Sequence, residues 1–310
     1  MDRNSVSWRG YIPAITTPFD KAGNLDLEAF DGQMVWLKSE GLQGVILAGT
    51  SGEWFSMTVQ ERADLFAAGA KFRDENFVVL GAGNAFTKAE AITHAHAAEK
   101  VGLDGLLLTI PPYIVPNRHE IVSFYQAVSD ASEIPLTVYN WPRGCIIDMG
   151  VDLLDELADI ENVVAIKNST GDFSSFLDGM YKLEHKVRYF GLPTSKLGAD
   201  LALLGHGDGL MGSGGVLGSD HSDFWRAIDA GNRDLAVALG ERDRVLMQDW
   251  FLPNFAAQFG NQQAIMKTAL RLRGIPGGYV RDPLLELTPD EVDRVRATLE
   301  TLEIETFPLS

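Results

Sequence analysis

Short apolar runs recur along the chain, each about five residues long and bounded by turn-forming residues. Most runs are continuous rather than alternating, which is typical of strands that are buried on both faces of a sheet. Eight runs predict strands at 11–15, 44–48, 77–81, 105–109, 135–139, 163–167, 187–191 and 208–212. Their starts lie about 28 residues apart, which leaves room for the helix that each parallel crossover requires.

The intervals between these runs carry helix signals. Thr58 and Glu61 have the spacing of a capping box, and Thr87 and Glu90 repeat it before a helical segment that Gly102 would end. Helical spacing also predicts the inner face of the first helix, formed by Leu27, Phe30, Met34 and Leu37. Strand and helix therefore alternate from the first run to the last.

Eight strand–helix units in series predict an α/β fold, the (β/α)8 or TIM barrel, with a C-terminal helical extension. A doubly wound open sheet is the structural alternative, but no strand is followed by a complete glycine-rich dinucleotide motif or a phosphate-binding loop. After the eighth unit the pattern is purely helical, at 224–229, 234–249, 264–273 and 289–302. We therefore predict a barrel over residues 1–222 and a helical region over 223–310 that packs on it.

Composition narrows the functional classes. The 43 acidic and 26 basic residues give a net charge of −17, which argues against nucleic-acid binding and against an anionic membrane surface as partners. The single cysteine, Cys145, excludes an intrachain disulfide and a four-cysteine zinc site, and the scattered histidines predict no metal site. Because no apolar run approaches the ~20 residues of a membrane helix and no signal-peptide pattern is present, we expect a soluble, cytoplasmic protein.

Lys167 is the strongest candidate for chemistry. It closes the apolar run at 163–166, so in a barrel its side chain would emerge at the carboxyl ends of the strands, where barrel active sites lie. Burial disfavours the ammonium form, and a neutral amine can form a Schiff base with a ketone. The alternative is a lysine that only extends from the strand end to solvent.

Tyr139 ends the neighbouring strand at the same level. Its phenol could move protons during imine formation, whereas alone it could equally be a packed tyrosine with a hydrated hydroxyl. The turn from Gly49 to Glu53 is rich in small residues, and the amides and hydroxyls of Thr50 and Ser51 suit a carboxylate. A tight turn that needs glycine for its backbone angles is the alternative interpretation.

Together these residues resemble the dihydrodipicolinate synthase / N-acetylneuraminate lyase family of Schiff-base (β/α)8 barrels. The likeness covers nearly the whole chain. It rests on the segments Ala14 to Phe19, Gly49 to Glu53, Pro111 to Tyr113, Tyr139 to Pro142, Ile166 to Ser169 and Lys267 to Gly274. The resemblance implies a homotetramer built from dimers. It also implies that no external cofactor is needed, because the substrate forms a covalent imine on Lys167.

The resemblance also implies roles for individual residues. Lys167 would form the imine with pyruvate or a longer 2-keto acid, Tyr139 would be the general acid and base, and Thr50 would help to relay protons. The candidates for substrate binding are Ser51, Gly49, Gly191, Gly212, Tyr113 and Arg143.

Two departures from the family pattern bear on the substrate. The lysine-precursor synthase has two tyrosines after strand four, whereas Ile114 follows Tyr113 here. The synthase also has an arginine five residues after the strand-five tyrosine, where this chain has Gly144, with Arg143 one position earlier. The segments 191–194 and 251–253 are instead similar to the sugar-acid dehydratase branch, such as 5-dehydro-4-deoxyglucarate dehydratase.

We therefore expect a class I lyase that cleaves or dehydrates a hydroxylated 2-keto acid, for example a 2-keto-3-deoxy sugar acid. The first alternative is 4-hydroxy-tetrahydrodipicolinate synthase, which condenses pyruvate with aspartate semialdehyde. The second, from another class, is a non-catalytic small-molecule sensor on the same barrel, which the presence of both Lys167 and Tyr139 disfavours.

Overall fold

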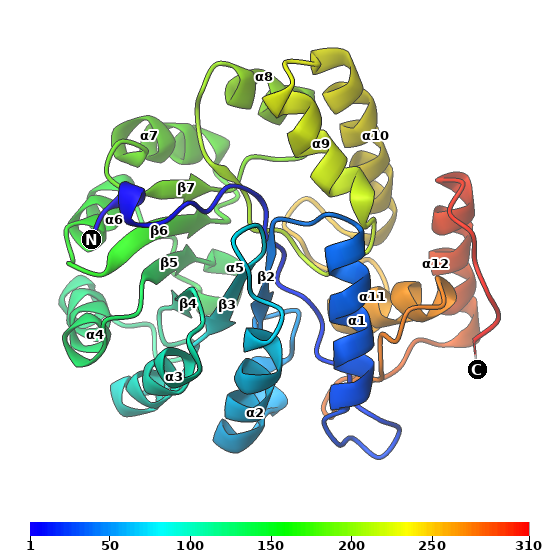
Figure 1. Ribbon diagram of the computed structural model, residues 1–310, viewed down its shortest axis with the longest axis horizontal. Helices are drawn as coiled ribbons and strands as arrows, with labels where there is room; N and C mark the ends of the chain where they lie inside the picture. The colour runs from blue at the N-terminus through cyan, green and yellow to red at the C-terminus, as the bar shows by residue number, and fades with distance from the viewer. Residues whose placement is uncertain (310) are drawn as a thin grey trace.

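Eight parallel strands form the centre of the computed structural model, which describes residues 1–309 (Figure 1). The strands are β1 (Gly10–Tyr11), β2 (Gly44–Leu47), β3 (Val78–Ala82), β4 (Gly105–Thr109), β5 (Leu136–Asn140), β6 (Val163–Asn168), β7 (Arg188–Phe190) and β8 (Gly209–Leu210). Strands β2 to β8 pair in chain order, and β1 pairs with β8. Ala14 forms bridges to both Ile46 and Ser213, which joins the two ends of the sheet. The predicted (β/α)8 barrel is confirmed.

Strands β1 and β8 are shorter than their apolar runs suggest. The runs at 11–15 and 208–212 pair over only two residues each, Gly10 with Gly209 and Tyr11 with Leu210. The backbones approach so closely that a Cβ atom on Gly209 would lie 2.1 Å from the carbonyl oxygen of Gly10. Glycine is required there, and it shortens the regular part of both strands.

Helices cover the outside of the barrel. They are α1 (Leu27–Ser39), α2 (Val59–Ala70), α3 (Lys88–Val101), α4 (Arg118–Ala131), the short α5 (Pro142–Cys145), α6 (Val151–Ala158), α7 (Phe173–Leu183), α8 (Lys196–Leu203) and α9 (Ser219–Asp229), with 3₁₀ turns η1 (Arg3–Ser5) and η2 (Trp54–Ser56). The capping box at Thr58 is confirmed, whereas Thr87 caps α3 through its own side chain without the reciprocal bond from Glu90. The prediction for Leu27 was wrong: its side chain is 38% exposed, and Gln33 takes the buried place by donating to the Thr16 hydroxyl.

Three further helices follow the barrel: α10 (Arg233–Trp250), α11 (Gln262–Leu272) and α12 (Pro289–Thr301). They enclose an apolar cluster of their own that includes Trp250, Leu270 and Leu299. Helix α9 packs against both β1 and α10, so the barrel passes into the extension without a break, and the division at residue 222 stays a prediction. Within residues 1–309, no helix combines the length and the apolar character needed to cross a membrane.

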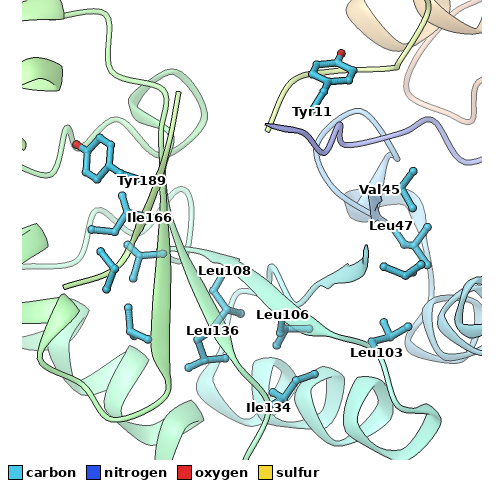
Figure 2. Packing of buried hydrophobic residues seen from close by; sticks show 14 of the residues in the cluster. Tyr11, Val45, Leu47, Leu103, Leu106, Leu108, Ile134, Leu136, Ile166 and Tyr189 are labelled. Atoms are coloured by element: carbon cyan, nitrogen blue, oxygen red, sulfur yellow. The ribbon is translucent and has the colours of Figure 1, made fainter. Parts of the chain in front are cut away.

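The strands bury both of their faces. Leu106, Leu108 and Leu136 belong to the layer between strands and helices, part of which Figure 2 shows, whereas Leu107 belongs to the cluster inside the barrel. Successive side chains of a strand point to opposite faces. The same alternation on β5 places Tyr139 with the interior cluster, next to the strand that carries Lys167.

Candidate active site

Lys167 and Tyr139 lie side by side at the carboxyl ends of β6 and β5. The strand register pairs the two residues directly, and the Lys167 Nζ atom lies 4.1 Å from the centre of the Tyr139 ring. The Lys167 side chain is only 6% exposed. Burial lowers the pKa of Lys167 to about 7, so a large share of the amine is unprotonated at neutral pH.

The Tyr139 phenol is held in its neutral form. Burial raises the pKa of Tyr139 well above 10, and hydrogen bonds with the side chains of Ser169 and Thr50 act in the opposite direction. The ring stacks on Trp141 with 5.8 Å between ring centres. The Lys167 amine thus lies over the Tyr139 ring, and the hydroxyl groups of Ser169 and Thr50 lie near the phenol, so that groups able to transfer protons surround this tyrosine.

The turn after β2 brings hydroxyl groups to the same place. Ser51 Oγ lies 2.6 Å from Ser213 Oγ, which comes from the segment after β8. The Gln262 side chain of α11 donates to Ser213 Oγ at 2.6 Å, and Gln263 donates to the Thr50 carbonyl oxygen at 2.9 Å. Helix α11 of the C-terminal extension thus fixes the turn from outside the barrel.

A buried ion pair makes a second link between this turn and the extension. The Glu53 carboxylate lies 2.5 Å from Nζ of Lys267 on α11, and both side chains are fully buried. Lys267 also donates to the Tyr279 carbonyl oxygen at 2.7 Å, and the Arg281 backbone N–H donates to Glu53 at 3.0 Å. Burial raises the pKa of Glu53 and lowers that of Lys267 to about 8, and their mutual attraction opposes both shifts.

A cavity of about 330 Å³ opens at this end of the barrel. It is lined by six of the residues that the sequence singles out: Thr50, Ser51, Tyr139, Lys167, Gly191 and Gly212. Arg143 lines a neighbouring cavity of about 470 Å³, which shares Thr50, Trp141 and Gln262 with the first. Neither cavity is lined by Gly49 or by Tyr113, and the Tyr113 side chain is 87% exposed.

Other lining residues escaped the sequence analysis. Ser169 and Ser213 each follow a predicted strand closely, so their position was a usable signal. Gln262 and Asp243 come from the helices after the barrel, and His221 comes from α9, the last helix that covers the barrel; they reach the cavity only through the way these helices dock. No local pattern marks them.

Comparisons with known proteins identify the family and the fold. The dihydrodipicolinate synthetase family matches residues 7–302. The chain is 28% identical over 301 residues to 4-hydroxy-tetrahydrodipicolinate synthase of Oceanobacillus iheyensis, with 94% of this chain and 96% of the relative covered. The enzyme of that name from Acidothermus cellulolyticus is 32% identical, with 92% and 89% covered. Dihydrodipicolinate synthase of Acinetobacter baumannii, crystallised with pyruvate, superposes with a TM-score of 0.85 at 25% identity, over 96% of this chain and all of the other.

Proposed function

Because the chain belongs to the dihydrodipicolinate synthetase family, we propose that it is a lyase that holds pyruvate or a hydroxylated 2-keto acid as an imine on Lys167. The observation that carries the proposal is the buried Lys167 amine, with its pKa lowered to about 7, beside the Tyr139 ring at the cavity. A buried, partly unprotonated lysine is the nucleophile that imine formation requires.

The proposed sequence begins with binding of the substrate carboxylate at the turn of Thr50 and Ser51. The Lys167 amine adds to the keto carbon, and Tyr139 supplies the proton with which the former carbonyl oxygen leaves as water. The protonated imine then accepts the electron pair from a breaking bond, either the bond between C3 and C4 or a C3–H bond before loss of the neighbouring hydroxyl. Since the imine itself receives the electrons, we propose that no external cofactor takes part.

Two features favour the lyase over the synthase alternative. A Cβ atom on Gly144 would lie 2.5 Å from the Trp141 ring, so a larger side chain fits there only if the tryptophan moves. Arg143, one residue earlier, lines the neighbouring cavity instead of the one that contains Lys167. The names of the relatives support the synthase alternative, so kcat/KM for both reactions must be measured on the same preparation.

Borohydride reduction in the presence of pyruvate tests the central proposal. The mass of the reduced adduct should appear on the peptide that contains Lys167 and should be absent from the Lys167→Ala variant. An adduct on another lysine, or none at all, contradicts it. The absence of an adduct would favour the non-catalytic sensor.

We also propose that the enzyme forms a homotetramer built from dimers and works in the cytoplasm. The loop after β4 supports the assembly, because Tyr113, Ile114 and Val115 are 87%, 60% and 48% exposed and form an apolar projection. Light scattering of the parent and of Ile114→Asp tests the assembly: the variant should dissociate if this loop is buried between subunits. Fractionation of the source cells tests the location.

A further inference from the structure

Beyond Lys167, the walls of the cavity are mostly carbon. Helix α7, helix α10 and the segment after α10 contribute apolar side chains, among them Phe173, Phe176, Leu246, Met247, Phe251 and Phe255. Phe173 stacks on Phe176 with 5.8 Å between ring centres, and Phe255 lies 6.3 Å from the Trp141 ring beside Tyr139. Any part of a substrate that extends from Lys167 into this space meets aromatic and aliphatic groups.

Several polar side chains in the same walls already have protein partners. Thr194 donates its hydroxyl to the Asp243 carboxylate, which also lies 3.0 Å from Nε2 of His221. Thr170 donates to Asp148 at 2.5 Å, and the Asn168 amide donates to the Tyr189 hydroxyl at 2.8 Å.

Among the polar side-chain atoms of these lining residues that are shut off from solvent within residues 1–309, Nδ1 of His221 lacks a partner. Its ring stacks on Tyr11, with 4.0 Å between ring centres.

These walls discriminate between two kinds of substrate chain. A chain with several hydroxyls would lose hydration against the apolar side chains that line this part of the cavity, which is unfavourable. An apolar group gains free energy by leaving water for the same walls. The two halves of the substrate thus meet different surfaces of the protein. Protein hydroxyl groups contact the half next to Lys167, and apolar side chains contact the other half.

We propose that the substrate is a 4-hydroxy-2-oxo acid whose substituent at C4 is apolar, an aryl or branched alkyl group. This inference rests on the proposed lyase function. In the reaction, the C3–C4 bond of the imine breaks, its electron pair forms an enamine, and the C4 hydroxyl loses its proton to Tyr139. An apolar aldehyde leaves, C3 takes up a proton, and water releases pyruvate from Lys167, so that all atoms of the substrate are recovered in the aldehyde and pyruvate.

The test compares 4-hydroxy-2-oxo-4-phenylbutanoate with 2-keto-3-deoxygluconate as substrates of the intact enzyme, by the rate of pyruvate release. The phenyl compound should have a kcat/KM at least about 10-fold higher, the scale on which an apolar pocket discriminates. Equal or better turnover of the sugar acid overturns the inference but leaves the proposed function standing, provided that borohydride still traps pyruvate on Lys167. Failure of the trap overturns both.

Variants of the cavity wall provide a second readout. Met247 is half-buried, and Met247→Gln keeps its length but adds an amide, so the preference for the phenyl compound should fall about 10-fold. Met247→Leu should keep the preference. Phe173→Gln, at a 40% exposed position, repeats the test if the first variant does not fold, and Val35→Gln on the exposed face of α1 is the control for added polarity elsewhere. An unchanged preference in both cavity variants refutes the inference.

Discussion

Replacement of Lys267 by methionine should destabilise the protein strongly and disturb the active site from a distance. The variant leaves the fully buried Glu53 carboxylate without its cation and the Tyr279 carbonyl without its donor. Breaking one half of a buried ion pair typically costs about 3–5 kcal/mol, because the remaining charge stays desolvated. For a chain of 310 residues this corresponds to a fall in Tm of roughly 5–8 °C.

The dependence on pH identifies the cause. Burial raises the pKa of Glu53, and without Lys267 the carboxyl group must take up a proton to stay buried. A group whose pKa is higher in the folded than in the unfolded state stabilises the fold below its unfolded pKa, and this contribution is lost as the pH rises. The Lys267→Met deficit should therefore be larger at pH 8 than at pH 5.

Two comparisons complete this experiment. The double variant Glu53→Gln, Lys267→Met removes both charges and should recover at least half of the lost stability. Lys182→Met breaks two surface ion pairs, with Asp152 at 3.2 Å and with Asp155 at 3.1 Å, and should cost less than about 1 kcal/mol. Urea unfolding, followed by circular dichroism, measures the free energy of unfolding of all three variants. The KM for pyruvate shows whether the turn of Thr50 still binds the substrate. A Lys267→Met cost below about 1 kcal/mol, without recovery in the double variant, refutes the reasoning.

Three further predictions concern the chemistry. The rate of imine formation with pyruvate should rise with pH to a plateau with a midpoint near 7, because burial lowers the pKa of Lys167 to about 7; stopped-flow trapping measures it, and a midpoint near 10 contradicts it. Tyr139→Phe should reduce kcat roughly 10²-fold with little change in Tm, and unaltered turnover would exclude the proton-transfer role. Ser51→Ala should raise the KM for pyruvate up to about 10-fold through loss of a hydrogen bond, and steady-state kinetics with an unchanged KM would remove Ser51 from the carboxylate site.

The barrel could be predicted because its signals are local. Five-residue apolar runs and the caps at Thr58 and Gly102 depend only on neighbours in the chain, and the structure has them where the pattern indicates. The juxtaposition of Lys167 with Tyr139 followed from two strand ends alone, because parallel neighbours end at the same edge. The prediction for Leu27 failed because it is the first residue of α1, where the side chain stays 38% exposed although its spacing suits the inner face.

Other parts of the site could not be predicted because they depend on docking. Nothing near Glu53 in the sequence shows that its partner is Lys267, and nothing near Asp243 shows that it meets Thr194 and His221. These contacts join the barrel to the extension, and they follow from the packing of whole helices. Polar residues on an amphipathic helix are ordinarily predicted to face solvent. The sequence pattern therefore gives no sign that polar residues of these helices are buried at the cavity.

The ion pair between Glu53 and Lys267 also constrains the order in which parts of the protein can fold during synthesis. During synthesis the turn of Thr50 emerges early, whereas its cation lies in α11, after the whole barrel has been made. Barrel closure is equally late, since β1 can pair with β8 only when both ends of the barrel exist. Such distant contacts slow folding and leave strand edges open meanwhile. A ribosome-bound chain that stops before α11 therefore contains Lys167 on β6, but its turn at Thr50 lacks the contacts that hold it in place. We expect such a chain to bind a keto acid only after the last helices have been synthesised.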